Sequence, residues 1–184
     1  MVKLKNISKR YGDKRVLDDV NMIFGEGITC IMGPSGRGKT TLAYIIAGLV
    51  PADAGSVETD GERFAVMFQE DRLLDWESAA GNVLFVNNDC EKAQTLLTEA
   101  GLADSIHLKA SELSGGMKRR VCLCRTLIAD YEVIILDEPF KGLDSGVKPK
   151  IMDMVKKHSQ GKIVICITHD EEEAKYLGGG IITI

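Results

Sequence analysis

The chain has 184 residues, of which 45% are hydrophobic and 27% are charged, so it is long enough for one globular domain with a substantial core. Its net charge of -4 at pH 7 argues against a nucleic-acid-binding protein, and no nucleic-acid partner is expected. No apolar run approaches the roughly 18 residues of a membrane span, and the N-terminus lacks the apolar centre of a signal peptide. We therefore expect a cytoplasmic protein.

The first part of the chain predicts several strands separated by glycine turns, with one helix among them. Alternating patterns and short apolar runs predict strands over residues 2–12, 15–24, 27–33, 55–61 and 63–69. A helix is expected over 38–50, where apolar residues recur every three to four positions before Pro51.

From residue 70 the pattern becomes irregular and then helical, without the apolar runs of buried strands. Helices are expected over 91–102, 115–130, 147–161 and 171–177, and strands over 132–139, 162–170 and 180–184. Strands that alternate with helices predict a parallel sheet covered on both faces. We predict a single domain, 1–184, in which residues 1–69 and 129–184 form an α/β core with an N-terminal antiparallel β portion. Residues of about 70–128 are expected to form a small helical lobe.

The five cysteines indicate neither a disulfide framework nor a zinc site, because their number is odd and no CxxC spacing occurs. Cys30 and Cys166 lie inside apolar, strand-like runs, where cysteine behaves as a small buried hydrophobic residue. We predict reduced, structural thiols.

The segment from Gly33 to Thr40 matches the pattern GxxxxGK[ST], follows a predicted strand and opens a predicted helix. Glycines let successive N–H groups converge on phosphate oxygens, and the helix N-terminus adds a favourable field. Lys39 is expected to reach the terminal phosphates, and the Thr40 hydroxyl to ligate Mg²⁺. The alternative is a simple glycine-rich turn before a helix. The motif in this context predicts a P-loop NTPase, with nucleotide-binding residues Gly33, Pro34, Ser35, Gly36, Arg37, Gly38, Lys39, Thr40 and Thr41.

Two carboxylates, Asp137 and Glu138, end the apolar run of the strand predicted over 132–139. Consecutive strand residues point to opposite faces, so both can face the phosphates only if the chain turns at Glu138. Pro139 makes this turn possible, since proline does not continue a central strand. Asp137 suits the Mg²⁺ shell and Glu138 suits polarising an attacking water. The alternative is a pair of surface acids.

His169 follows the last long predicted strand, at its carboxyl end. Ligands of open α/β sheets gather outside these ends, so His169 is expected near the phosphates and Glu138. A lone histidine is more often structural, and His107 and His158 are assigned no role.

These motifs, in this order, resemble those of the ATP-binding-cassette (ABC) ATPases over nearly the whole chain. Besides the Walker A loop at Gly33–Thr40 and the Walker B strand ending in Asp137, the sequence "LSGG" at 113–116 resembles the family signature. Tyr11 matches the A-loop aromatic, Gln69 the Q-loop, Asp144 the D-loop and His169 the H-loop.

The resemblance implies two copies of the chain paired head to tail, with ATP and Mg²⁺ as cofactors. Ser114, Gly115 and Gly116 of one copy would then contact the γ-phosphate bound by the Walker A loop of the other. By the same resemblance Tyr11 stacks on adenine, Gln69 touches Mg²⁺ and Asp144 reaches across the dimer. His169 would contact the γ-phosphate together with Glu138. The catalytic set expected is Glu138, His169 and Lys39, and the metal set is Thr40, Gln69 and Asp137.

The segment "EDRLLDW" after Gln69 resembles importer ATPases of the nitrate, sulfonate and taurine type. The resemblance implies a motor subunit on the inner face of the cell membrane, bound to integral membrane permease subunits through the 70–86 region. Leu73, Leu74 and Trp76 are the contact candidates, with core packing as the alternative. A soluble ABC ATPase, acting as a macromolecular clamp or assembly factor, and a regulator without turnover are the other hypotheses. Met117 stands where the family often has glutamine, and the helical lobe is shorter than usual.

Overall fold

The computed structural model describes residues 1–184, which divide into two compact units. The core unit comprises Met1–Val66, Tyr131–Asp137 and Gly161–Ile184, and the helical unit comprises Met67–Asp130 and Glu138–Gln160. In this division Glu138–Gln160, which the sequence analysis placed in the α/β core, groups with the helical residues.

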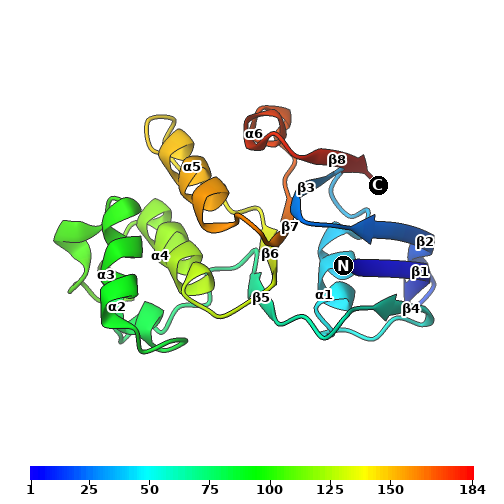
Figure 1. Ribbon diagram of the computed structural model, residues 1–184, viewed down its shortest axis with the longest axis horizontal. Coiled ribbons are helices and arrows are strands. Elements are labelled where there is room, and N and C mark those ends of the chain that lie inside the picture. The colour runs from blue at the N-terminus through cyan, green and yellow to red at the C-terminus, as the bar shows by residue number, and fades with distance from the viewer. The chain divides into compact units, whose positions relative to one another are not determined.

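Five strands form the main sheet of the core unit in the order β5-β6-β7-β3-β8 (Figure 1). They are β3 (Gly27–Met32), β5 (Phe64–Met67), β6 (Val133–Asp137), β7 (Ile163–Ile167) and β8 (Gly180–Thr183). β3 pairs in parallel with β7 and β8, and β6 pairs in parallel with β7. Every residue of β6 and β7 is buried, as expected for strands covered on both faces. The predicted parallel core is confirmed.

A separate three-stranded antiparallel sheet has the order β2-β1-β4 and consists of β1 (Val2–Tyr11), β2 (Lys14–Phe24) and β4 (Ala54–Glu58). Val2, Leu4 and Ile7 of β1 are buried, which accounts for the alternating pattern of this segment. The antiparallel β portion predicted for the N-terminal part of the chain is therefore confirmed.

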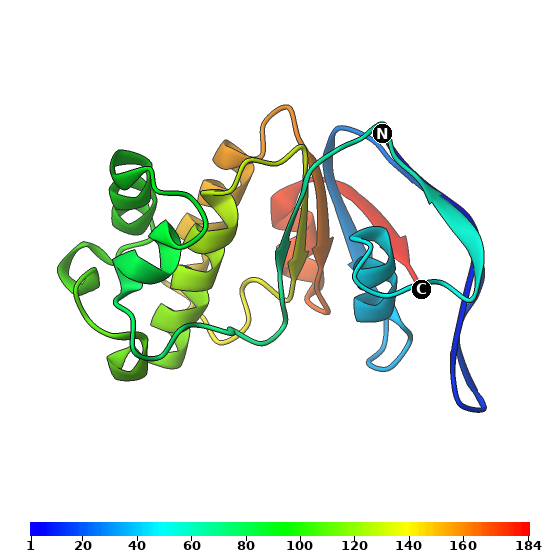
Figure 2. The same ribbon diagram turned by 90° about the horizontal axis from the view of Figure 1, so that it is seen from below.

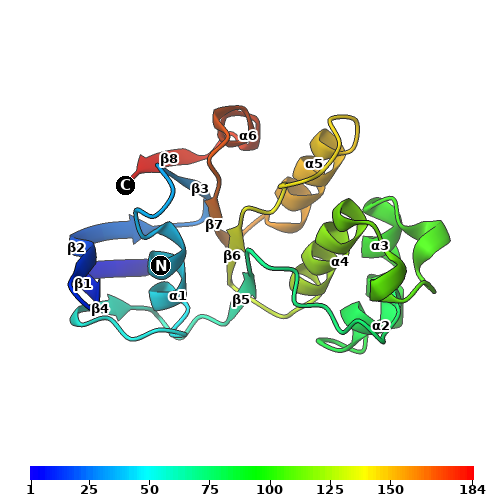
Figure 3. The ribbon, with the colours of Figure 1, turned by 180° about the vertical axis from the view of Figure 1, so that it is seen from behind.

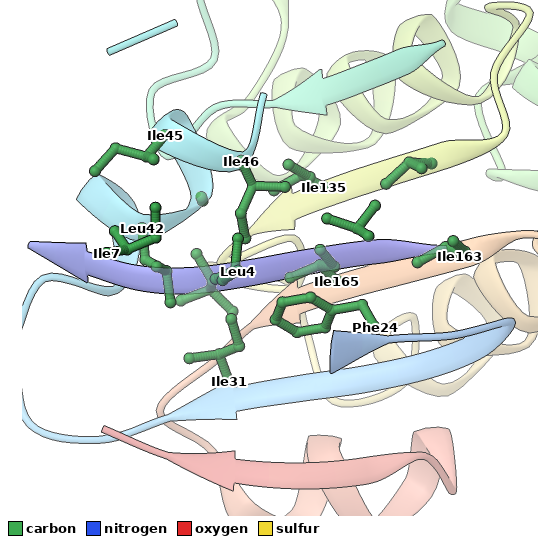
Figure 4. Packing of buried hydrophobic residues seen from close by; sticks show 14 of the residues in the cluster. Leu4, Ile7, Phe24, Ile31, Leu42, Ile45, Ile46, Ile135, Ile163 and Ile165 are labelled. Atoms are coloured by element: carbon green, nitrogen blue, oxygen red, sulfur yellow. The ribbon is translucent and has the colours of Figure 1, made fainter. Parts of the chain in front are cut away.

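Helix α1 (Lys39–Ile46) lies between the two sheets of the core unit (Figure 2). Its buried side chains and those of both sheets form one hydrophobic cluster, in which Leu42 and Ile46 face β1 and the main sheet (Figure 4). The labelled members of this cluster are Leu4, Ile7, Phe24, Ile31, Leu42, Ile45, Ile46, Ile135, Ile163 and Ile165. This packing fixes the helix that follows the phosphate loop.

The helical unit contains four α-helices: α2 (Ala79–Leu84), α3 (Cys90–Glu99), α4 (Gly115–Leu127) and α5 (Lys148–His158). α2 contacts α3 and α4, and α3 contacts α4 (Figure 3). Glu99 of α3 pairs with Lys157 of α5, and its Oε2 lies 2.7 Å from His158 Nε2. The hydrogen bond from Lys157 holds the pKa of Glu99 below its ordinary value. The last helix, α6 (Glu171–Leu177), belongs to the core unit.

Several elements end two or three residues before the expected ends, and the largest differences concern α1 and α2. α1 ends at Ile46 instead of Val50, because Gly48 adopts a left-handed conformation (φ 70°) and Leu49 N donates to Tyr44 O at 2.8 Å. α2 is a distinct short helix that begins after Ser78, whose hydroxyl accepts a hydrogen bond from Gly81 N.

All five cysteines are free thiols, of which Cys90 is exposed and the other four are buried. None of the helices is both long enough and apolar enough to span a bilayer.

Candidate functional site

The loop between β3 and α1 curls because its glycines adopt conformations that other residues rarely reach. Gly33, Gly36 and Gly38 have φ values of 142°, 79° and 90°. A Cβ on Gly38 would lie 2.8 Å from Val16 Cγ1, so a side chain at this position would clash with β2. Local packing therefore excludes a side chain at Gly38, and the positive φ values favour glycine at all three positions.

Lys39, the first residue of α1, is buried within this loop. Its Nζ donates to Gly33 O at 2.7 Å and to Pro34 O at 2.9 Å. Its charge is thus held inside the ring of backbone groups, at the N-terminus of a helix, where an anion is stabilised. Ser35, Gly36 and Arg37 are exposed on the outside of the loop.

Thr40 and Asp137 meet although they are far apart in the sequence. The Thr40 hydroxyl donates to Asp137 Oδ2 at 2.8 Å, and Asp137, at the end of β6, is 1% exposed. A hydroxyl and a carboxylate side by side are hard oxygen donors, the type that Mg²⁺ prefers. No group of three or more histidine, cysteine or acidic residues could hold a metal alone. The pair fits a Mg²⁺ ion whose remaining ligands are phosphate and water oxygens.

The sheet register brings His169 to the edge of the sheet that carries the phosphate loop. Ile31 of β3 is paired with Ile167 of β7, and Thr168 N donates to Ile31 O at 3.3 Å. Gly33 lies two residues after Ile31, and His169 lies two residues after Ile167. Both therefore lie at the carboxyl ends of neighbouring parallel strands. The His169 side chain is exposed there.

Tyr11, at the end of β1, is 51% exposed. It is paired with Lys14 of β2, whose Nζ lies 3.9 Å from the point where a Cβ on Gly36 would be. Val16, two residues further along β2, contacts the position of Gly38. The β1–β2 turn is therefore anchored beside the phosphate loop, and it carries an exposed aromatic ring that has Lys9 Nζ 5.7 Å from its centroid.

In the helical unit, Glu138 has a φ of 52°, which is unusual for a residue with a side chain. The chain thus turns at Glu138, as the pattern "DEP" predicts. The Glu138 carbonyl accepts hydrogen bonds from Arg119 Nη2 at 2.7 Å and Nε at 3.1 Å. Gln69, in the same unit, has an exposed side chain, and its carbonyl also accepts a hydrogen bond from Arg119, at 3.1 Å. Arg119 is absent from the residues predicted from the sequence.

The signature and the D-loop line one pocket of the helical unit, with a volume of about 260 Å³. Ser114 caps α4, its hydroxyl accepting from Met117 N at 3.3 Å, and Gly115 is exposed. A Cβ on Gly116 would lie 3.3 Å from Gly142 O, so glycine permits this close approach. The residues that line the pocket are Ser114, Gly116, Arg120, Gly142, Leu143, Asp144 and Val147.

The predicted site residues thus fall into two sets. In the core unit the structure brings together the phosphate loop, Asp137, His169 and Tyr11. In the helical unit it brings together Ser114, Gly116 and Asp144, while Gln69 and Glu138 share the bonds of Arg119. The sequence holds no signal for Arg119, because most of its partners are backbone carbonyls.

Comparisons with known proteins agree on one family. A family model described as "ABC transporter" matches residues 17–141. The aliphatic sulfonates import ATP-binding protein SsuB 2 of Burkholderia cenocepacia is 38% identical over 200 residues, covering 100% of this chain and 73% of that protein. The taurine import ATP-binding protein TauB of Escherichia coli O157:H7 is 34% identical over 202 residues, covering 100% of this chain and 79% of that protein.

Two solved structures are also similar. A dimeric structure of MJ0796, a bacterial ABC transporter cassette, has a TM-score of 0.90 and 30% identity, covering 100% of this chain and 94% of that chain. A dimeric structure of a post-hydrolysis state of the same cassette, bound to ADP and Pi, has a TM-score of 0.89 at 30% identity, with the same coverage.

Proposed function

The chain belongs to the ABC transporter family, and we propose that it powers solute import as a head-to-tail dimer bound to separate membrane subunits. As a member of this family it binds ATP and hydrolyses it. The observation that best supports the individual assignments is the meeting of Thr40 and Asp137 beside the buried Lys39. This arrangement accounts for a nucleotide with a metal ion at its terminal phosphates.

In the proposed site, the N–H groups of the loop from Gly33 to Thr41 hold the phosphates, and the Lys39 ammonium offsets the negative charge of the terminal ones. Thr40, Asp137 and Gln69 would hold Mg²⁺, which when bound would offset negative charge on the phosphate oxygens. Tyr11 stacks on the adenine ring.

Glu138 is the proposed group that orients the attacking water and accepts its proton. His169 donates to the γ-phosphate and so keeps the water and the phosphorus in line. Both residues follow parallel strands at their carboxyl ends, where ligands of such sheets bind.

The signature supplies the other side of the site, from the second copy. Ser114 and Gly115 are exposed at the N-terminus of α4, a 13-residue helix, and Gly116 beside them is half-buried. Such an end stabilises an anion, but the phosphate loop of the same chain already has its own helix N-terminus at α1. A γ-phosphate held by both ends joins two copies, and Asp144, beside Ser114 in the pocket, extends the contact. Hydrolysis removes this charge and releases them.

The proposed permease contact is the exposed apolar surface of the 70–86 region. Trp76 is 70% exposed and Phe85 is 76% exposed, and exposed apolar side chains in one region are typical of protein contacts. Leu73 and Leu74 are only half buried, and the backbone of Leu74 is fixed by the buried Asn82, which bonds its N and its O at 2.8 and 3.1 Å. This loop is thus held in one shape, as a docking surface requires.

We expect the ATPase rate of the purified chain to rise with the square of protein concentration at concentrations well below the dimer dissociation constant. In this range the dimer concentration depends on the square of the monomer concentration, and only the dimer has complete sites. Steady-state phosphate release over a dilution series measures this. A rate strictly proportional to protein concentration down to the lowest dilution would contradict the shared site.

We expect Trp76→Glu to abolish recovery of a multispanning protein with the tagged chain from detergent-solubilised membranes, because a charge replaces the exposed ring. Leu49→Glu is the matched control, since Leu49 is an exposed apolar residue as well, at 52%, but belongs to the core unit. Equal recovery with Trp76→Glu, or recovery of soluble macromolecules alone, would argue against the importer assignment.

A further inference from the structure

Arg119 joins two segments of the helical unit that lie far apart in the sequence. It is 4% exposed, and its Nη1 bonds the carbonyls of Phe68 and Gln69 at 3.0 and 3.1 Å. The same Nη1 lies 3.1 Å from Asp71 Oδ1. Its other two donor nitrogens, Nε and Nη2, both bond the Glu138 carbonyl. One buried guanidinium therefore connects residues 68–71 with the residue proposed to activate water.

Two other side chains on this side of α4, Cys122 and Arg125, also bond the 68–72 segment. Cys122 Sγ donates to Asp71 O at 2.7 Å, and burial raises the pKa of this thiol to about 12, so it remains a neutral donor. Arg125 donates to Arg72 O at 2.8 Å and to Asp71 O at 2.9 Å. Spaced three apart, Arg119, Cys122 and Arg125 lie along one side of the helix. Of these three side chains, Arg119 is the one that bonds the Glu138 carbonyl.

Glu138 needs support for the conformation it adopts. A left-handed φ brings Cβ close to the following carbonyl, and this costs free energy for any residue except glycine. Pro139 adds a restriction, because the residue before proline favours extended conformations. The Glu138 carbonyl accepts two bonds from Arg119 and one from Lys141 N at 3.2 Å. These bonds fix the orientation of the peptide and with it the direction in which the Glu138 side chain leaves the backbone.

We propose that Arg119 is a positioning residue that sets the orientation of the Glu138 carboxylate and anchors it to the 68–72 segment. The inference rests on the role of Glu138 proposed above. An arginine suits this position because its planar fork delivers several N–H groups in fixed directions, whereas a lysine supplies one point of charge. The simpler alternative is that Arg119 only stabilises the helical unit through its ion pair with Asp71.

The test compares Arg119→Gln with Arg125→Gln, since Arg125 bonds the same segment but not Glu138. For Arg119→Gln we expect kcat to fall on the order of 10- to 100-fold, the effect of a small misplacement of a reacting group. The KM for ATP and the Kd for nucleotide should change less than twofold, because the phosphate loop is untouched. Arg125→Gln should keep kcat within twofold, and Arg119→Lys should give an intermediate kcat. If Arg119→Gln does not fold, Arg119→Lys against Arg125→Lys provides the same comparison.

A second measurement separates positioning from stability. In a Glu138→Gln background, adding Arg119→Gln should change the residual rate less than twofold, because the group that Arg119 orients is already lost. A full multiplicative loss in the double variant would overturn the proposal, as would an equal fall of kcat in the Arg119 and Arg125 variants. If Glu138→Gln alone leaves turnover unchanged, the role of Glu138 is wrong, which is a different failure from an inert Arg119→Gln.

Discussion

Lys39→Ala is expected to abolish ATP binding at concentrations that saturate the unmodified chain. Hydrogen bonds from a charged donor contribute about 1.5–3 kcal/mol each, and the Lys39 ammonium is the only side-chain cation held inside the loop. Loss of about 3 kcal/mol lowers affinity by roughly 100-fold. Isothermal titration with ATP, or equilibrium dialysis of a labelled nucleotide, measures the change.

Lys5→Ala serves as the control for this variant. Lys5 also belongs to the core unit, but its ammonium pairs with Glu58 on the surface of the antiparallel sheet, where an ion pair stabilises little. Its ATP affinity should remain unchanged. Equal nucleotide affinity in Lys39→Ala, with thermal unfolding showing a folded protein, would refute the assignment of the phosphate loop.

Glu138→Gln is expected to retain ATP binding and to lose hydrolysis. Glutamine has nearly the same size as glutamate and leaves the backbone hydrogen bonds of residue 138 in place. It cannot accept the proton of the attacking water. A general base contributes roughly 10²- to 10⁴-fold to a rate, so single-turnover phosphate release should slow by that factor. Nucleotide binding measured in parallel should be unchanged.

Glu132→Gln is the matched control, at the other end of the same strand. Glu132 precedes β6 and bonds Arg63, which lowers its pKa to about 2, and it belongs to the core unit. Its substitution should leave phosphate release at the rate of the unmodified chain. Full turnover in Glu138→Gln would mean that another group activates the water.

Much of the core unit could be predicted from local patterns. The runs that became β6 and β7 are apolar throughout because both faces of these strands are covered, and this leaves a clear signal. The sequence of the helical unit carries a weaker signal for its secondary structure. α2 is short, and its start depends on the capping hydroxyl of Ser78 and on the buried Asn82, two polar residues that resemble loop residues in a sequence. The end of α1 at Ile46 depends on the conformation of Gly48.

The resemblance to ABC ATPases is confirmed by the family match and by relatives named as import ATP-binding proteins. The residues that carry chemistry could be named because phosphate binding requires particular residue types at fixed spacing, as from Gly33 to Thr40. Arg119 could not be named in this way, because apart from the Asp71 carboxylate its hydrogen-bond partners are the backbone carbonyls of Phe68, Gln69 and Glu138. Any residue type supplies a carbonyl, so such a contact leaves no pattern in the sequence and becomes visible only when the chain is folded.

The most direct test of the shared site is ATP-dependent dimerisation of Glu138→Gln, with and without Gly115→Glu, by sedimentation equilibrium. A side chain at Gly115 meets no atom within 4 Å in the single chain, and an acidic residue in the first turn suits the helix dipole, so α4 should remain folded. We predict that Glu138→Gln is a dimer with ATP and a monomer with ADP. The double variant should bind ATP with the same affinity yet stay monomeric, since the new carboxylate faces the partner's γ-phosphate. Monomeric Glu138→Gln at saturating ATP, or an equally stable dimer of the double variant, would contradict the account.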